Sequence, residues 1–345
     1  MPRLTRPSAK GARIRLEIDS DPIARFRADL ERHGFDEARL GLAVSGGPDS
    51  LALLLLAHAA CGAERIAAAT VDHGLREGSA TEAAFVADIC HELGVEHAII
   101  PVSVDEGNVQ ANARAARYLA LGQWHDEARA GALLTAHHAD DQAETLLMRL
   151  NRGSGVAGLA GIRSTTEIPG WGGTLLRPLL RWRKAELEAI VRRAGIDPVR
   201  DPSNADENFD RVRMRDFLSS QDTLDAGAIA ASAEHLEDAW RAIEWFAAED
   251  WETHVVPDSD ASGRAFRYYA NAPRAIGIET IQRIVTELGG AASRSDAARA
   301  WDRLWQGENA SLAGVLVIPG TETIDKVGVM MRVWRFAPEP PRKAG

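Results

Sequence analysis

The segment Ser45-Gly46-Gly47-Pro48-Asp49-Ser50 has the composition best suited to chemistry on a phosphate group. It lies between an apolar run (40–44) and a helix-like run (50–60). Two glycines let the backbone turn sharply and approach a ligand, Pro48 suits a first helical turn, and free N–H groups with the helix dipole cradle an anion. Ordinary turns use the same residue types. The segment lacks the lysine of GxxxxGK[ST], which excludes the kinase-like P-loop class.

A pair of acids, Asp141 and Glu144, offers a second kind of chemistry. The two residues are three positions apart on a predicted helix, so both carboxylates project from the same face near its N-terminus, where the dipole stabilises negative charge. Such a pocket suits an ammonium group or a metal ion. A solvated helix start with ordinary N-terminal acids is the alternative that the helix by itself leaves open.

Histidines and arginines near the same predicted strand ends could handle protons and phosphate charge. His137 and His138 directly follow a short apolar run. Consecutive side chains of an extended backbone face opposite ways, which favours contact with phosphate or proton handling over a shared metal; a buried structural histidine is the alternative. Arg76 and Arg117 could neutralise a triphosphate and its transition state, although a helix surface is the commonest place for arginine.

Asp49 is the carboxylate nearest to the glycine segment. ATP chemistry normally brings Mg²⁺ held by one or two carboxylates and several waters, so Asp49 is the candidate magnesium ligand. A cap at the N-terminus of the following helix would also explain an aspartate there.

The elements that must position these residues follow a regular alternation. Short apolar runs alternate with longer helical runs, which predicts βαβ units and an α/β fold: a parallel sheet with helices on both faces. Ligands of such sheets collect beyond the carboxyl ends of the strands, here just after Val44, Val71 and Ala136. The expected strands are 40–44, 66–71, 97–104 and 132–136, and the expected helices are 50–60, 80–93, 109–130 and 141–150.

The remainder of the chain predicts a second, smaller domain. Glycine-rich stretches (153–161 and 170–173), a helix (184–194) and a polar loop (197–210) come first. Long helical stretches at 225–251, 274–288 and 295–305 follow, and a hairpin over 312–336, with Pro319 and Gly320 at its centre, closes the chain. We expect a basic N-terminal extension (1–20), a catalytic domain (21–219) and a mostly helical domain with a C-terminal hairpin (220–345).

The charge balance restricts any nucleic-acid partner to a local patch. The chain has 40 basic and 50 acidic residues, a net charge of −10, so a polyanion must meet a basic region. Residues 174–215 provide one, with ten basic and seven acidic residues. Trp171 and Trp182 lie within or beside it and could stack on splayed bases, although a tryptophan at a domain seam is the alternative, favoured for Trp182.

Composition also limits the compartment and the metal chemistry. Two cysteines without a CxxC pair, Cys61 and Cys90, argue against a structural zinc site, an iron–sulfur thiolase centre and a disulfide scaffold, and favour a reducing cytoplasm. The longest apolar run, 51–57, is too short for a bilayer, so no membrane partner is expected. The basic N-terminus could instead be a transit peptide, but acids follow it too soon.

The glycine segment resembles the SGGxDS pyrophosphate loop of the N-type ATP pyrophosphatases, whose fold is Rossmann-like (adenine nucleotide alpha hydrolase-like). The motifs that follow it are similar to those of the tRNA(Ile)-lysidine synthetases. They read VDHGLR (71–76), NVQANARAARY (108–118), HHADDQAET (137–145), RGSGVAGL (152–159), and RPLL (177–180) with DPSN (201–204). The family's RNxxR element is Arg211-Val212-Arg213-Met214-Arg215 here, which keeps both arginines and replaces the asparagine. The last third resembles the family only loosely.

The resemblance implies a ligase. ATP would adenylate the C2 oxygen of the wobble cytidine of tRNA(Ile) with a CAU anticodon, and free lysine would then displace AMP to form lysidine, changing the codon read from AUG to AUA. Asp141 and Glu144 would hold the ε-amine of lysine. The implied catalytic residues are Asp49, His137 and Arg117; the ATP contacts are Ser45, Gly46, Gly47, Pro48, Asp49, Ser50, Val71, Asp72 and His73; and the tRNA contacts are Arg76, Arg152, Arg181, Arg211 and Arg215.

Two other classes of function stay open at this point. Another ATP pyrophosphatase, such as a tRNA thiolase or an amide-forming synthetase, would share the fold but needs reactive cysteines or a glutaminase domain. A nucleotide-binding sensor without chemistry would not need Asp141, Glu144 or the basic flank. The sequence also leaves open whether two chains associate as a homodimer.

Overall fold

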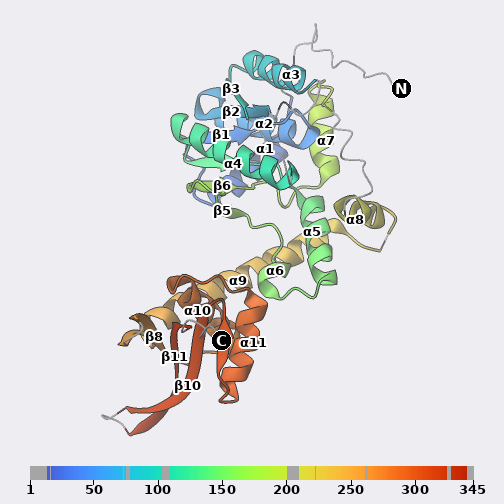
Figure 1. The fold of residues 1–345 in the computed structure, drawn as a ribbon. Helices are drawn as coiled ribbons and strands as arrows, with labels where there is room; N and C mark the ends of the chain where they lie inside the picture. The colour runs from blue at the N-terminus through green and yellow to red at the C-terminus, as the bar shows by residue number, and fades with distance from the viewer. Residues whose placement is uncertain are drawn as a thin grey trace. The chain divides into compact units, whose positions relative to one another are not determined.

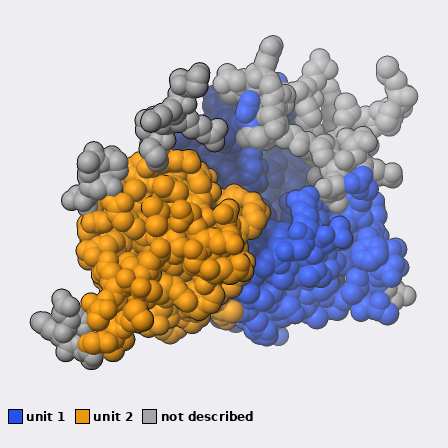
Figure 2. All heavy atoms as spheres, turned by 60° about the horizontal axis from the view of Figure 1, so that its bottom comes forward, with its two compact units in different colours: residues 1–237 blue, residues 238–345 orange. Residues whose placement is uncertain are grey.

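The computed structural model describes residues 14–339 apart from 16, 73, 75–77, 103–108, 200–209, 222, 261–262 and 325–327. The chain divides into two compact units, 1–237 and 238–345 (Figure 2), which are treated separately below. Two residues implied in the site, His73 and Arg76, lie outside the described residues, as do most of the predicted N-terminal extension and of the polar loop 197–210.

A six-stranded sheet organises the first unit (Figure 1). Its order is β3-β2-β1-β4-β6-β5, and all pairs are parallel except β5 with β6. From the central β1 the chain runs outward through β2 and β3 and then returns to place β4 on the other side of β1. Strands that diverge in this way open a crevice beyond their carboxyl ends. The strands are β1 (Leu40–Ala43), β2 (Ile66–Asp72), β3 (Glu96–Pro101), β4 (Ala132–Leu134), β5 (Thr165–Glu167) and β6 (Thr174–Leu176).

Helices cover both faces of this sheet, which confirms the predicted α/β class. Leu40 and Leu42 of β1 join the core beneath α2, whereas Ala67 and Ala69 of the adjacent β2 join a second core beneath α4, because successive strand residues face opposite sides. The helices are α1 (Ser20–Glu31), α2 (Pro48–Cys61), α3 (Ser79–Glu92), α4 (Val109–Glu127), α5 (Ala139–Asn151), α6 (Val156–Leu159), α7 (Lys184–Arg193) and α8 (Asp210–Ser219). In the described part of the chain, no helix has the length and apolarity needed to cross a membrane.

The second unit packs helices against an antiparallel sheet of order β7-β8-β11-β10-β9. Its core gathers Tyr268, Trp301, Trp334 and Phe336 with three of the isoleucines of α10. A buried hydrogen bond from Thr280 Oγ1 to Asp250 Oδ2 (2.7 Å) ties α10 to α9. The elements are α9 (Ala226–His254), which crosses the boundary between the units, β7 (Val255–Asp260), β8 (Gly263–Tyr269), α10 (Arg274–Glu287), α11 (Arg294–Trp305), β9 (Ala310–Leu312), β10 (Val315–Ile324) and β11 (Val329–Pro338).

The C-terminal hairpin is present, but its turn was predicted at the wrong place. Pro319 and Gly320 lie inside β10, opposite Trp334 and Val333 of β11, and the chain reverses after Ile324. Strand β9 pairs with β10 only up to Val317. Proline is tolerated at Pro319 because, among the described residues, no strand pairs with that edge of β10 beyond Val317, so no donor is needed there.

The unit boundary lies at 237/238, later than the predicted boundary at 219/220, because the first half of α9 is bonded to the first unit. Glu237 accepts hydrogen bonds from the Ser164 N–H and hydroxyl (3.1 and 3.0 Å). Glu234 accepts one from Arg181 Nε (2.7 Å). These polar bonds give no periodic signal in the sequence.

Trp182 belongs to the core of the first unit, so neither the base-stacking nor the domain-seam interpretation describes it. It is 1% exposed, and its indole N–H donates to the buried carboxylate of Asp29 (3.0 Å). Trp171 is 41% exposed, and its N–H donates to exposed Asp126 (3.0 Å). The two tryptophans therefore make the same bond in different environments.

We expect Trp182→Phe to lower the free energy of unfolding by about 1–3 kcal/mol, because it leaves a buried acceptor with one donor fewer. Trp171→Phe, the matched control, should cost less than about 1 kcal/mol because water replaces the lost donor. Urea unfolding of both variants measures this difference, and equal costs would show that burial of the bond does not matter.

Candidate functional site

The glycine segment forms the turn between β1 and α2. Gly46 has φ +81°, a left-handed conformation that glycine adopts at little cost. A β-carbon there would lie 3.2 Å from methyl carbons of both Val86 and Val199. Val199 also donates its N–H to the Gly46 carbonyl (2.9 Å), so the chain after α7 packs onto the turn. Gly47 then precedes α2, and Pro48 occupies the first turn as predicted.

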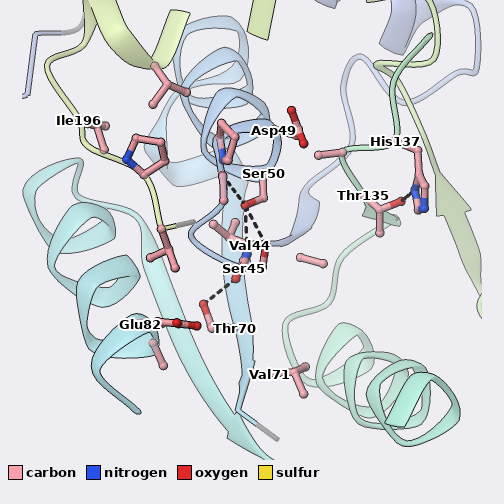
Figure 3. Close-up of a pocket in the computed structure, with 18 of the residues that line it drawn as sticks. Val44, Ser45, Asp49, Ser50, Thr70, Val71, Glu82, Thr135, His137 and Ile196 are labelled. Atoms are coloured by element: carbon pink, nitrogen blue, oxygen red, sulfur yellow. Dashed lines mark hydrogen bonds between the residues drawn. The ribbon is translucent and has the colours of Figure 1, made fainter. Parts of the chain in front are cut away.

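Two serines close this loop on itself (Figure 3). The Ser45 N–H donates to Ser50 Oγ (3.1 Å), and the Ser50 hydroxyl donates to the Gly47 carbonyl (3.0 Å). Ser50 is buried, whereas Ser45 is exposed. These hydrogen bonds within the loop fix its shape. The N-terminus of α2 points into the crevice, where its free N–H groups can bind an anion.

A cavity of about 1420 Å³ lies beyond the carboxyl ends of β1, β2 and β4, where the topology predicts a ligand. Figure 3 shows the loop residues, Val71, Thr135 and His137 around it. The cavity is lined by ten of the residues singled out from the sequence: Ser45, Gly47, Pro48, Asp49, Ser50, Val71, Arg117, His137, Asp141 and Arg211. It is open and large enough for a nucleotide.

Three residues at the N-terminus of α5, the cap His138 and the acids Asp140 and Asp141, hold the far side of the crevice. His138 caps the helix: its Nδ1 accepts the Asp141 N–H (3.3 Å), and Asp141 Oδ2 accepts the His138 N–H (3.1 Å). Asp140 accepts the first N–H of α7, from Lys184 (2.8 Å). Asp141 bonds Arg211 of α8 instead. One helical turn thus fixes α7 and α8 around the cavity.

Asp49 faces the same turn across the crevice. Its Oδ2 lies 3.6 Å from His138 Nε2, while its Oδ1 is buried without a hydrogen-bond partner among the described residues. An unpaired, buried carboxylate oxygen beside a phosphate cradle fits a magnesium ion that takes its other ligands from phosphate and water. Within the described residues, no cluster of three histidine, cysteine or acidic side chains could hold a metal ion unaided.

The two histidines differ in protonation. Burial lowers the pKa of His137 to about 4, against the pull of the Asp141 carboxylate; its Nδ1 lies 3.1 Å from Thr135 Oγ1. Burial also opposes the charged form of His138, but the carboxylates around it, Asp49 first, raise the pKa of that residue. His137 is therefore neutral at pH 7.

The predicted acid pair is bonded to the two predicted tRNA arginines of α8. Arg211 donates from Nη2 to Asp141 Oδ1 (3.0 Å) and from Nε to Glu144 Oε2 (2.8 Å). Arg215 donates from Nε to Glu144 Oε1 (2.8 Å). Burial opposes ionisation of Asp141, but the charges of His138 and Arg211 lower the pKa of its carboxyl. Val212 replaces the family asparagine and lies between the two arginines in the sequence. Its side chain is buried.

The remaining predicted residues lie off the cavity lining. Gly46 is buried beneath the loop, and Asp72 accepts the N–H of Gly74 (3.0 Å). Glu144 is buried against Arg211 and Arg215, with a side chain 2% exposed. Arg152 is exposed at the end of α5, and Arg181 pairs with Glu234.

Sequence reasoning left out two residues that the structure brings to the site. His138, passed over in favour of His137, links Asp49 to Asp141; the signal was its place three residues before an acid at a helix start. Lys184 lines the cavity from the first turn of α7. The sequence shows that Lys184 begins a helical run, but it does not show that the start of α7 lies beside the crevice.

Comparison with known proteins agrees with this geometry. A family model described as PP-loop domain matches residues 20–221. A tRNA(Ile)-lysidine synthase from Novosphingobium aromaticivorans is 43% identical over 94% of this chain and 96% of its own length, and one from Zymomonas mobilis is 40% identical over 88% and 90%. This chain belongs to the tRNA(Ile)-lysidine synthase family. The predicted family is thereby confirmed.

A solved structure supports the fold alone. The U34-tRNA thiolase NcsA from Methanococcus maripaludis, with its 4Fe-4S cluster, superposes with a TM-score of 0.53 and 17% identity, over 64% of this chain and 79% of that one. In this lysidine synthase family member both cysteines are buried in the core, and burial raises the pKa of Cys90 to about 12. Neither thiol is placed for thiolation chemistry.

We expect Gly46→Ala to destabilise the protein by at least about 1–2 kcal/mol, the usual cost of a left-handed non-glycine residue, because its methyl also meets Val86 and Val199. Gly47→Ala is the control: Gly47 has φ −72°, and its added carbon would meet only Ser45 Oγ, at 3.7 Å. Denaturant unfolding should separate the two. Equal stability would contradict the strained-turn account.

Acid should destabilise the fold through His137. The unfolded chain binds this proton near pH 6.5 and the folded chain only near pH 4, so the stabilisation is complete above pH 6.5 and is lost as the pH falls toward 4. Between about pH 7.5 and pH 5, the wild type should lose about 2 kcal/mol more than His137→Asn. Exposed His235→Asn is the control, and a wild-type slope in His137→Asn would refute the assignment.

Proposed function

We propose that this protein is an ATP-dependent ligase that joins free lysine to C2 of the wobble cytidine of tRNA(Ile), forming lysidine. Lysidine synthases that align over nearly the whole chain support the proposal. The observation that carries it is the single crevice shared by the pyrophosphate loop and the first turn of α5. Both half-reactions can therefore occur beside the same cytidine.

In the first step, the C2 oxygen of cytidine attacks the α-phosphorus of ATP. The bond from the α-phosphorus to the bridging oxygen breaks, and diphosphate leaves into the loop of residues 45–50. The N-terminus of α2 stabilises the charge on the departing group, and Arg117, which lines the cavity, neutralises the transition state. The product is a cytidine whose C2 carries AMP as a leaving group.

In the second step, the neutral amine of lysine attacks C2. The C2–N bond forms, the C2–O bond breaks, and AMP departs with the original cytidine oxygen. The amine loses one proton, which neutral His137 is placed to accept. We propose Asp141, which lines the cavity from the first turn of α5, as the lysine-binding acid. Glu144 acts through Arg211, to which both acids are bonded.

Magnesium is proposed to bind at Asp49, whose unpaired Oδ1 suits a hard cation. The ion supplies neutralisation of phosphate charge when bound. Asp49, in turn, is oriented by His138 at 3.6 Å.

The tRNA contacts also remain proposals. The proposed contacts are exposed Arg152 at the end of α5, exposed Arg181, and Arg211 and Arg215 of α8, all in the first unit; Arg76 is implied by the sequence alone. We propose a cytoplasmic enzyme, and association of two chains as a homodimer is proposed only as an arrangement to be tested by light scattering.

The first step can be tested as ATP–diphosphate exchange without lysine. We expect exchange that requires tRNA(Ile) with a CAU anticodon, and lysine incorporation into that tRNA when lysine is added. Asp49→Asn should reduce exchange on the order of 100-fold, since it removes the charge that a magnesium ion needs. Exposed Asp88→Asn on α3 is the control. Exchange without tRNA would contradict adenylation of the base.

A further inference from the structure

The ion-pair network on α5 and α8 leaves no free place for an ammonium group at Glu144. Glu144 has a side chain 2% exposed, and its two oxygens accept hydrogen bonds from Arg211 and Arg215 at 2.8 Å each. It does not line the cavity. Asp141 and Arg211 do line it, and their side chains are 17% and 43% exposed. A ligand in the cavity therefore meets one carboxylate and one guanidinium side by side.

Charge balance decides what can enter this pair. The two acids and two arginines that bond one another here carry no net charge, so these pairs provide no excess negative charge to attract an ammonium ion. An ammonium that displaced Arg211 from Asp141 would leave a partly buried guanidinium with one partner fewer, at a cost in free energy. A zwitterion avoids this cost, because one ion pair is exchanged for two.

The chemistry of the attack points the same way. A nucleophilic amine must present a lone pair, and a carboxylate partner stabilises the protonated form. The amine held by Asp141 is thus poorly suited to attack. An α-amino acid anchored by its backbone groups instead sends its side-chain amine onward into the cavity, where His137 is also found.

We propose that Asp141 binds the α-ammonium and Arg211 the α-carboxylate of the lysine substrate, while Glu144 acts as a positioning residue that holds Arg211 in place. The inference rests on the proposed function and refines it: the ε-amine is left free to attack C2. It also assigns Arg211 to the amino acid rather than to tRNA phosphate. Arg215, whose Nε is also bonded to Glu144, completes the clamp.

Two lysine analogues test the two contacts separately. Lysinamide lacks the carboxylate charge and ε-aminocaproic acid lacks the α-amine, yet both keep the ε-amine. For each enzyme, kcat/KM is measured for lysine and both analogues at saturating ATP and tRNA, with the modified nucleoside identified by mass. We expect the wild type to prefer lysine over either analogue on the order of 10- to 100-fold, the usual value of one charged hydrogen bond.

Each variant should lose one preference and keep the other. Arg211→Gln should accept lysinamide about as well as lysine while still rejecting ε-aminocaproic acid, and Asp141→Asn should show the reverse. Exposed Arg213→Gln, on the same helix, should behave as wild type. These ratios are internal to each preparation, so partial unfolding does not alter them.

The contrary outcomes are distinct. A wild type without preference, or an Arg211→Gln enzyme that keeps its preference for lysine over lysinamide, would overturn the inference. If Arg211 contacted tRNA instead, Arg211→Gln would raise the KM for tRNA equally with every amine and leave the ratios unchanged. Absence of any lysine-dependent product in the wild type would refute the proposed function itself.

Discussion

The parallel pairing of β1 with β4 is the constraint on which the rest of the site depends. Leu40 to Leu42 pair with Ala132 to Leu134, so the turn that follows β1 and the helix that follows β4 start from the same edge of the sheet. The glycine loop and the first turn of α5 must then face each other. A single strand register thus brings together the phosphate cradle and the groups that handle the second substrate.

The buried ion pairs that α5 makes with α7 and α8 determine which second substrate the site accepts. Asp140 fixes the start of α7, and Asp141 with Glu144 fixes α8. Such pairs contribute little net stability because desolvation offsets their attraction, but breaking one by removing a partner is costly. The network therefore favours ligands that preserve the number of ion pairs. The network selects ligands by their distribution of charge and adds little to their affinity.

Periodicity and turn chemistry were sufficient to predict the parallel sheet and the crevice. Strands such as β1 are short and apolar, helices such as α2 begin at a proline, and the switch point between β1 and β4 then places the ligand. The pairing of Arg211 with Asp141 and Glu144 was not predictable, because ion pairs between residues about 70 positions apart leave no local pattern. The same reason explains the late unit boundary in α9.

The second unit was predicted less completely. Strands β7 and β8 were not foreseen. The first of them, Val255–Asp260, carries a proline and several polar residues and lacks alternation. Pro319 misled the placement of the turn, because proline marks both turns and unpaired strand edges. Composition alone does not distinguish these two uses.

The central claim is that one crevice transfers the cytidine oxygen to AMP and replaces it with the lysine amine. The most direct test places a heavy-oxygen label at O2 of the wobble cytidine, in an anticodon made by chemical synthesis, and follows a single turnover with ATP and lysine. The account predicts that the label appears in the phosphate of AMP, one atom for each lysidine formed. Unlabelled AMP, or label released into diphosphate or water, would contradict it.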